Sequence, residues 1–218
     1  MHINFYCDDC LAGMSSMPDD SVDVTLTDIP YEFINKQSGG LRTLDKGAAN
    51  DFNFDIYEML EEVYRITKNQ VIMFCGKEQF STIFDYFSVK DGTTRTIVWE
   101  KTNPSPMNGQ YVYLSGVELA VWFKPHKRGV FNEHCKNTVF KHANSSRKIH
   151  PTQKSIALIE EIILDNSNEG DIIFDPFTGS GTTGVAAVKN GRSFYGFEIN
   201  DKFYMHAKNR ITKAWQSK

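Results

Sequence analysis

A glycine-rich turn between a short apolar run and a helical pattern constrains the fold of this chain more than any other feature. The turn, Asp175-Pro-Phe-Thr-Gly-Ser-Gly-Thr-Thr-Gly184, follows the run at 172–174 and opens the helical pattern at 182–189. Glycines at 179, 181 and 184 have the spacing of a nucleotide-binding turn, in which the backbone comes close to a ligand. The turn therefore predicts a ligand site at the end of a strand in a layered α/β protein.

Strand and helix patterns alternate along the rest of the chain, which is what such a protein requires. Apolar and β-branched runs predict strands at 22–26, 71–75, 94–99, 117–123, 172–174 and 193–197. Apolar residues at helical spacing predict helices at 57–66, 78–87, 156–164, 182–189 and from 201 onward. This alternation predicts an α/β fold with a mostly parallel sheet and helices on both faces. We expect residues 1–218 to form a single domain, because no repeat or linker divides them.

Two segments show no clear periodicity. Residues 32–53 are polar and contain glycines, so we expect a mobile loop with a functional role. Residues 124–150 belong to a basic segment: from Lys124 to Lys154 the net charge is +7, whereas the rest of the chain carries −10. This polarity predicts a face that binds nucleic acid, and a solvated surface loop is the alternative. The side chains expected to contact nucleic acid are Lys127, Arg128, Lys136, Lys141, Arg147 and Lys148.

The composition excludes several classes of protein. A chain that is 40% hydrophobic and 23% charged is too apolar to be disordered. It has neither an apolar run long enough to span a membrane nor a signal-peptide pattern at its start, so we expect a cytoplasmic protein. The four cysteines are too few for a disulfide scaffold. Cys7 and Cys10 lack the second pair that a zinc site would need, and we expect no metal.

Three kinds of ligand compete for the glycine turn. A P-loop is excluded because no lysine follows the glycines. A dinucleotide site is disfavoured because the 49 residues from Gly170 onward hold only one mononucleotide half. Asp175 favours S-adenosylmethionine, because a carboxylate would repel a pyrophosphate but would pair with the ammonium group of a methionine moiety. Glu198, nineteen residues after Gly179, could accept both ribose hydroxyls, and a turn without a ligand remains the simpler alternative.

A second motif, Asp28-Ile29-Pro30-Tyr31, ends the first predicted strand. It offers a carboxylate, a main-chain carbonyl at Ile29 and an aromatic ring within four residues. Because Ile29 precedes a proline, its backbone is restricted to an extended conformation. An aromatic amine could donate hydrogen bonds to Asp28 and to the Ile29 carbonyl while Tyr31 stacks on its ring.

The two motifs together resemble those of the amino-methylating DNA methyltransferases, in which a D/N/S-P-P-Y/F/W tetrapeptide accompanies an F-x-G-x-G cofactor loop. The tetrapeptide comes first and His150-Pro-Thr-Gln-Lys-Ser155 stands between the motifs, an order that resembles the β class of this family. Ile29 replaces the first proline of the family motif, and Ser155 replaces the proline after the lysine. The resemblance extends over nearly the whole chain.

The resemblance implies a Rossmann-like methyltransferase sheet with a circularly permuted motif order. It implies methyl transfer from S-adenosylmethionine to the N6 amine of a flipped adenine in DNA, since aspartate at position 28 is typical of adenine enzymes. Cytosine N4 methylation is one alternative. A catalytically inactive DNA-binding protein is another, because Ile29 departs from the motif. The resemblance also implies a bacterial or phage-infected cell and leaves a homodimer open.

The same resemblance implies the residues of the site. Those assigned to catalysis are Asp28, Ile29, Pro30 and Tyr31. Those assigned to the cofactor, with Glu198 at its ribose and Asp9 or Cys10 at its adenine, are Asp9, Cys10, Asp28, Thr152, Lys154, Asp175, Phe177, Gly179, Gly181, Thr182 and Glu198.

Overall fold

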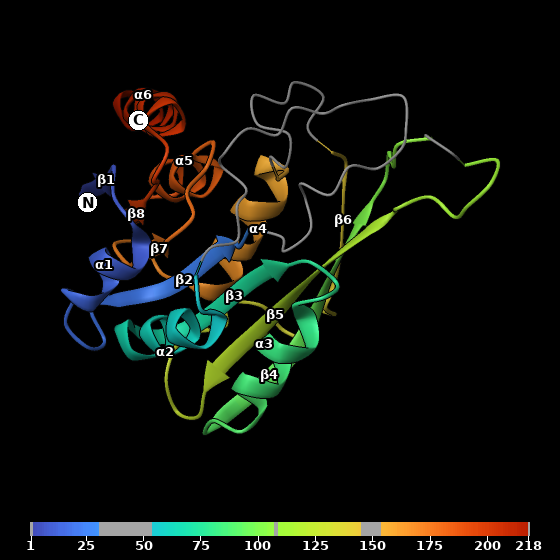
Figure 1. The fold of residues 1–218 in the computed structure, drawn as a ribbon, viewed down its shortest axis with the longest axis horizontal. Helices are drawn as coiled ribbons and strands as arrows, with labels where there is room; N and C mark the ends of the chain where they lie inside the picture. Colours follow the sequence, from blue (N-terminus) through green and yellow to red (C-terminus); the bar gives the residue numbers. More distant parts are fainter. Residues whose placement is uncertain (1, 31–53, 107–108, 145–153, 218) are drawn as a thin grey trace.

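The structure is a computed structural model that describes residues 2–30, 54–106, 109–144 and 154–217. Strands and helices alternate along most of this part of the chain (Figure 1). The elements, in chain order, are β1 (Ile3–Tyr6), α1 (Cys10–Ser15), β2 (Val22–Asp28), α2 (Ile56–Ile66), β3 (Thr67–Cys75), α3 (Phe80–Ser88), β4 (Gly92–Lys101), β5 (Val117–Pro125), β6 (Val139–His142), α4 (Ile156–Asn166), β7 (Ile172–Asp175), α5 (Thr182–Lys189), β8 (Ser193–Phe197) and α6 (Asp201–Gln216).

The strands form one sheet in the order β1-β8-β7-β2-β3-β5-β4-β6. Its first five strands are parallel neighbours, and β5 pairs antiparallel with both β3 and β4. The prediction of a mostly parallel sheet is therefore confirmed. Strands β1, β8, β7, β2 and β3 all end at one side of the sheet, which we call the carboxyl edge. Because β5 runs the other way, β5 begins at the carboxyl edge while β4 and β6 end there.

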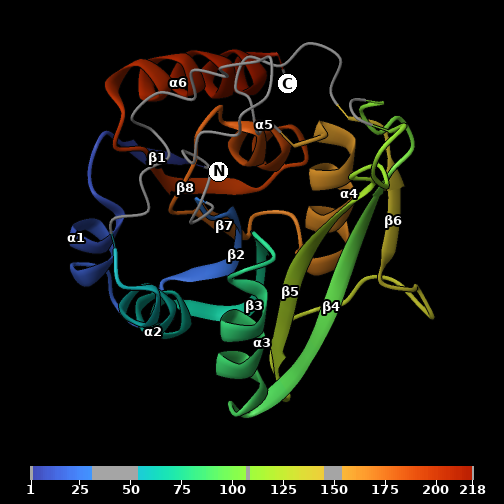
Figure 2. The ribbon, with the colours of Figure 1, turned by 45° about the vertical axis from the view of Figure 1, so that its right-hand side comes forward.

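Helices cover both faces of the sheet, as expected, and the two helical layers lie on opposite sides of it (Figure 2). Helices α4, α5 and α6 pack their apolar side chains on one face, whereas α1, α2 and α3 pack on the other. Each layer has its own cluster of buried side chains, so the sheet is apolar on both faces, as parallel strands usually are.

Three short elements were not predicted from the sequence. Strand β1 and strand β6 have four residues each and lie at the two outer positions of the sheet. Helix α1 has six residues. Elements this short contain too few residues to show a period. Strand β6 lies within the segment for which no period was found, and the predicted loop at 32–53 lies outside the described residues.

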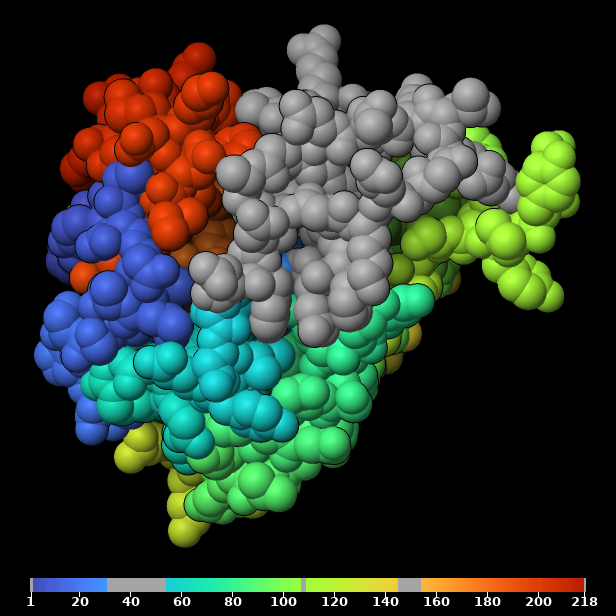
Figure 3. Space-filling view, in the orientation of Figure 1, coloured from blue at the N-terminus to red at the C-terminus, as the bar shows by residue number. Residues whose placement is uncertain are grey.

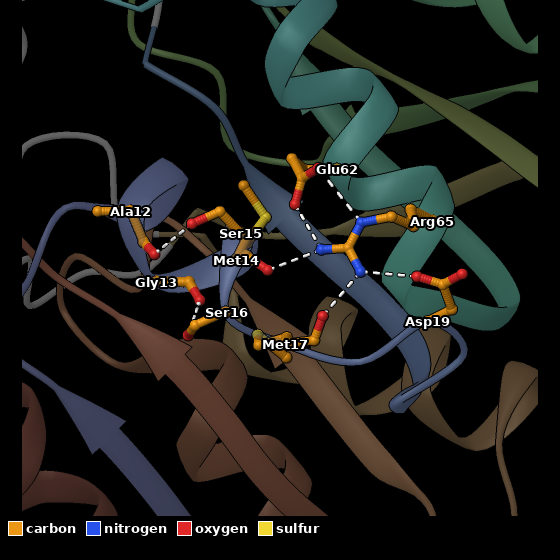
Figure 4. A network of polar contacts seen from close by, with 9 residues as sticks. All are labelled: Ala12, Gly13, Met14, Ser15, Ser16, Met17, Asp19, Glu62 and Arg65. Carbon is orange, nitrogen blue, oxygen red and sulfur yellow. Dashed lines mark hydrogen bonds and ion pairs between the residues drawn. The ribbon is translucent and has the colours of Figure 1, made fainter.

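Arg65 fastens the end of α1 to α2 (Figure 4). Its guanidinium group donates hydrogen bonds to the carbonyl oxygens of Met14 and Met17, at 2.8 and 2.7 Å. It also forms ion pairs with Glu62 at 2.6 Å and with Asp19 at 2.8 Å. A planar group with several donors can satisfy the free carbonyls at a helix end in this way.

The described residues of the β4–β5 connection, 102–106 and 109–116, project from the body of the molecule (Figure 3). Tyr111 and Tyr113 on this connection are exposed. Among the described residues, no helix is both long and apolar enough to cross a membrane.

Candidate active site

The two sequence motifs meet at the carboxyl edge. Asp28 ends β2 and Asp175 ends β7, and these strands are parallel neighbours. The hydroxyl group of Thr27, the residue before Asp28, donates a hydrogen bond to the Asp175 carboxylate at 2.7 Å. Glu198 follows β8, the next strand in the sheet. Parallel pairing of three strands therefore brings together the three carboxylates predicted to form the site.

Asp175 is buried, with 3% of its surface exposed. Its carboxylate accepts hydrogen bonds from the Thr27 hydroxyl and, at 3.1 Å, from the Phe177 amide. Burial nevertheless raises the pKa of Asp175 from 3.8 to about 7, because the charged form loses its hydration. A cation that approaches this carboxylate would favour its ionised form. The position therefore suits an ammonium group.

Glu198 holds the glycine turn against β8. One carboxylate oxygen accepts the Gly179 amide and the other accepts the Asn200 amide, each at 2.8 Å. Burial raises the pKa of Glu198 above its usual value. Gly179 and Gly181 have φ values of +51° and +80°, in the left-handed region that side chains disfavour. A Cβ at Gly181 would also lie 2.9 Å from the Cβ of Ala207 in α6.

The remaining residues predicted near the cofactor lie at the same edge. Asp9 and Cys10 follow β1, which pairs with β8. Asp9 caps α1 through the amides of Leu11 and Ala12, at 2.9 and 3.0 Å. Burial raises the pKa of Cys10 to about 12, so its thiol is neutral.

Two further described cofactor residues belong to the glycine turn, and Lys154 is described below. Phe177 stacks on Phe54 with ring centroids 5.2 Å apart. Thr182 is buried at the start of α5, with its hydroxyl oxygen 3.1 Å from that of Ser180. Thr152 lies outside the described residues. Within the described part of the chain, no cluster of three or more His, Cys, Asp or Glu side chains could hold a metal ion.

The tetrapeptide is held by two contacts that fix its backbone. The Ile29 amide donates to the carbonyl of Phe74 in β3 at 3.1 Å, and the Ile29 side chain is 1% exposed within the apolar cluster of α1–α3. The side-chain amide of Gln79 donates to the Pro30 carbonyl at 2.9 Å. Gln79 is itself buried and accepts the Gly76 amide. Gln79 was not predicted from the sequence, and Tyr31 lies outside the described residues.

Lys154 is buried and belongs to a chain of charges whose other members are half-buried, rather than being a solvated residue. Its ammonium group lies 2.6 Å from a carboxylate oxygen of Asp28 and 2.7 Å from one of Glu118. The other oxygen of Glu118 lies 2.6 Å from the ammonium group of Lys101. We call these four residues, Asp28, Lys154, Glu118 and Lys101, the charge chain. The sequence gives no local sign of it, because its members come from β2, β4, β5 and the segment before α4.

The four described basic residues that were predicted to bind nucleic acid do not gather around this site. Lys127 and Arg128 follow β5, which ends at the edge opposite the carboxyl edge, and Arg128 pairs with Asp20 at 3.2 Å. Lys136 pairs with Glu161 and Asp165 at 2.8 and 2.7 Å. Lys141, in β6, is nearer the carboxyl edge and pairs with Glu100 at 3.2 Å. Arg147 and Lys148 lie outside the described residues.

Comparisons with known proteins identify the relatives of this chain. The N6/N4 methyltransferase family model, described as DNA methylase, matches residues 22–209. The type II methyltransferase M.HpaI of Haemophilus parainfluenzae is 31% identical over 236 residues, which cover 94% of this chain and 73% of that protein. The type II methyltransferase M2.MboI of Moraxella bovis is 27% identical over 243 residues, which cover 96% of this chain and 87% of that protein.

Two solved structures share the fold. The M1.HpyAVI–SAM complex has a TM-score of 0.74 and 29% identity, covering 95% of this chain and 99% of that one. The PvuII DNA methyltransferase, described as cytosine-N4-specific, has a TM-score of 0.73 and 15% identity, and the match covers 99% of this chain and 92% of that one. The expected Rossmann-like methyltransferase fold is therefore confirmed. Because the family model spans most of its length, this chain belongs to the N6/N4 family of DNA methylases.

Proposed function

We propose that this DNA amino-methyltransferase acts on adenine, transferring a methyl group from S-adenosylmethionine to the N6 amine of a flipped base. S-adenosylmethionine is the cofactor of the reaction. The observation that carries the proposal is the hydrogen bond between Thr27 and Asp175. It joins the strand of the tetrapeptide to the strand of the glycine turn, so that amine acceptors and cofactor residues share one edge.

The residues at this edge fit S-adenosylmethionine. Asp175 would pair with the ammonium group of its methionine part, which would neutralise a carboxylate whose pKa burial has raised. Glu198 would accept the ribose hydroxyls, because each carboxylate oxygen can accept a second hydrogen bond besides its amide partner. Asp9 or Cys10 would face the adenine of the cofactor. When bound, the cofactor supplies an electrophilic methyl group on a sulfonium.

The tetrapeptide would prepare the amine for attack. The lone pair of an exocyclic amine is delocalised into its ring, which makes the amine a poor nucleophile. Asp28 and the Ile29 carbonyl would accept its two hydrogens and turn the lone pair toward the methyl group. The amine nitrogen would bond to the methyl carbon as the carbon–sulfur bond breaks, with neutral S-adenosylhomocysteine as the leaving group and one amine proton released to solvent. Correct placement supplies most of the rate enhancement.

The backbone contacts of the tetrapeptide support catalysis despite the substitution at Ile29. The Ile29 amide is paired with Phe74, and Gln79 holds the next carbonyl, so the direction of the Ile29 carbonyl is restricted. The target atom lies inside the duplex, so the base must be flipped out. We propose that Tyr31 then stacks on it, a contact worth about 1–3 kcal/mol.

Asp28 is the reason to favour adenine, because the resemblance associates aspartate at this position with adenine enzymes. Mass spectrometry of nucleosides, from DNA incubated with the purified protein and S-adenosylmethionine, tests the proposal. We expect N6-methyladenine. N4-methylcytosine in its place would move the substrate to cytosine. The absence of both, with the cofactor bound, would support the inactive alternative.

A further inference from the structure

The charge chain places a buried positive charge beside the residue that is proposed to hold the target amine. Lys154 is 5% exposed, and its ammonium group lies 2.6 Å from Asp28. The methyl donor is itself a cation at sulfur, and its methyl group must reach an amine bound at Asp28. Charges of the same sign repel more strongly in a buried site than in water. An uncompensated Lys154 would therefore oppose binding of the methyl donor.

Glu118 supplies the compensating charge. It lies on β5, which begins at the carboxyl edge, and one of its carboxylate oxygens is 2.7 Å from Lys154. Burial alone would raise the pKa of Glu118, but the ammonium groups of Lys154 and Lys101 hold it below its usual value. Glu118 is therefore ionised at neutral pH. With Lys101 at 2.6 Å, the chain has two positive and two negative members and no net charge.

We propose that Glu118, held in place by Lys101, is the counter-charge that makes the buried Lys154 compatible with a cationic methyl donor. Glu118 acts through Lys154 as a positioning residue, and it thereby raises affinity for S-adenosylmethionine relative to S-adenosylhomocysteine. The two ligands carry the same amine, carboxylate and nucleoside and differ in the charge at sulfur. This inference rests on the proposed function, because it needs the methyl donor to bind beside Asp28.

The affinity ratio of the two ligands tests the inference directly. Calorimetric titration gives the Kd of each ligand for the wild type and for Glu118→Gln, which keeps the size of the side chain and removes its charge. We expect the preference for S-adenosylmethionine over S-adenosylhomocysteine to fall about tenfold in this variant, because the chain gains a net positive charge. A general disturbance of the site would weaken both ligands equally and leave the ratio unchanged.

A second variant changes the net charge of the charge chain in the opposite direction. Lys101→Met gives the chain a net negative charge, so we expect the preference for S-adenosylmethionine to rise. Glu100→Gln is the matched control for Glu118→Gln, because it also replaces a glutamate by glutamine. Glu100 is the residue before Lys101, but it pairs with the exposed Lys141 at 3.2 Å rather than with the charge chain. We expect the control to keep the wild-type ratio.

The outcomes separate this inference from the proposed function. If the wild type bound neither ligand, the proposed function itself would fail. If the wild type bound both and methylated DNA, an unchanged ratio in Glu118→Gln and in Lys101→Met would overturn the counter-charge alone. Should Glu118→Gln fail to fold, Lys101→Met decides: a raised ratio supports the inference and an unchanged ratio overturns it.

Discussion

Asp175 is buried, which disfavours its ionised form. Its proposed role, pairing with the ammonium group of S-adenosylmethionine, requires that ionised form. Burial raises its pKa to about 7, whereas the usual value is 3.8. The folded protein therefore holds this proton more tightly than the unfolded chain does. The stability that this adds is fully present below the unfolded pKa and is lost as the pH rises through about 7. A bound ammonium group would offset that loss by stabilising the ionised form.

This titration gives a prediction for cofactor affinity. Because the ammonium group pairs with the ionised carboxylate, affinity for S-adenosylmethionine should fall as the pH drops below about 7. The decrease should approach about tenfold per pH unit. In Asp175→Asn, affinity should be weaker and this part of the pH dependence should disappear. Calorimetric titrations across this pH range would measure both effects, and an unchanged profile in the variant would contradict the assignment.

The free energy of unfolding should depend on pH in the opposite direction to cofactor affinity, falling as the pH rises. Between about pH 5 and pH 8, the free energy of unfolding of the cofactor-free wild type should fall by about 2 kcal/mol more than that of Asp175→Asn. Urea denaturation at several pH values would measure this difference. Equal pH dependence in both proteins would mean that Asp175 does not have a raised pKa in the folded state.

At the scale of elements, the glycine turn joins β7 to α5 and packs against α6. Gly181 has a φ of +80°, and a Cβ there would meet Ala207 at 2.9 Å. Gly181→Ala therefore introduces both backbone strain and a clash with α6. We expect a loss of about 2 kcal/mol in the free energy of unfolding. We also expect weaker binding of S-adenosylmethionine. Thermal unfolding and titration would measure the two effects.

An informative control for Gly181→Ala is Gly170→Ala. Gly170 also has a positive φ, of +91°, but a Cβ there would meet nothing within 4 Å. This control carries the backbone strain without the clash, and it precedes β7, whereas the glycine turn follows that strand. If both variants lost equal stability, and neither lost cofactor affinity, the contact between the turn and α6 would be unimportant.

The sequence was sufficient to predict the elements that have long apolar patterns. Helix α5 and strand β8 have the predicted bounds, and α2 differs from prediction by one residue. The short outer strands β1 and β6 were missed, because four residues cannot show a pattern of their own. Their position in the sheet depends on hydrogen bonds with β8 and β4.

The sequence predicted the candidate-site residues that lie in a local motif. It missed those whose partners come from other strands. Asp28, Asp175 and Glu198 each stand in a recognisable stretch, so their meeting at one edge followed from a parallel sheet. Gln79 and Glu118 act through partners that are distant in sequence. Their roles depend on the strand order, in particular on β5 lying beside β3, which the sequence pattern does not determine.

At the scale of the whole molecule, part of the charge of the basic segment is matched by acidic side chains from other segments. Arg128 pairs with Asp20, Lys136 pairs with acidic residues of α4, and Lys141 pairs with Glu100. A count along the sequence cannot include these partners. The net charge of +7 therefore overstates the positive field that this segment presents to DNA.

The position of these residues gives a prediction for DNA binding. Lys141 lies near the carboxyl edge, whereas Lys127 and Arg128 follow β5 at the opposite edge. We expect Lys141→Ala to reduce the slope of log affinity against log salt by about 0.9, the value for one phosphate contact. The double variant Lys127→Ala/Arg128→Ala should keep the wild-type slope. The reverse result would place the DNA along the opposite edge.

The central claim is that Asp28 at the end of β2 holds the target amine, while separate residues at the same edge bind the cofactor. Single-turnover methyl transfer to DNA by Asp28→Ala, with S-adenosylhomocysteine affinity measured on the same protein, tests it most directly. S-adenosylhomocysteine is the suitable ligand because its neutral sulfur is insensitive to the lost charge. We predict affinity within a few-fold of wild type and a rate at least about 1,000-fold lower. A folded variant that still methylates DNA within tenfold of the wild-type rate would contradict the account.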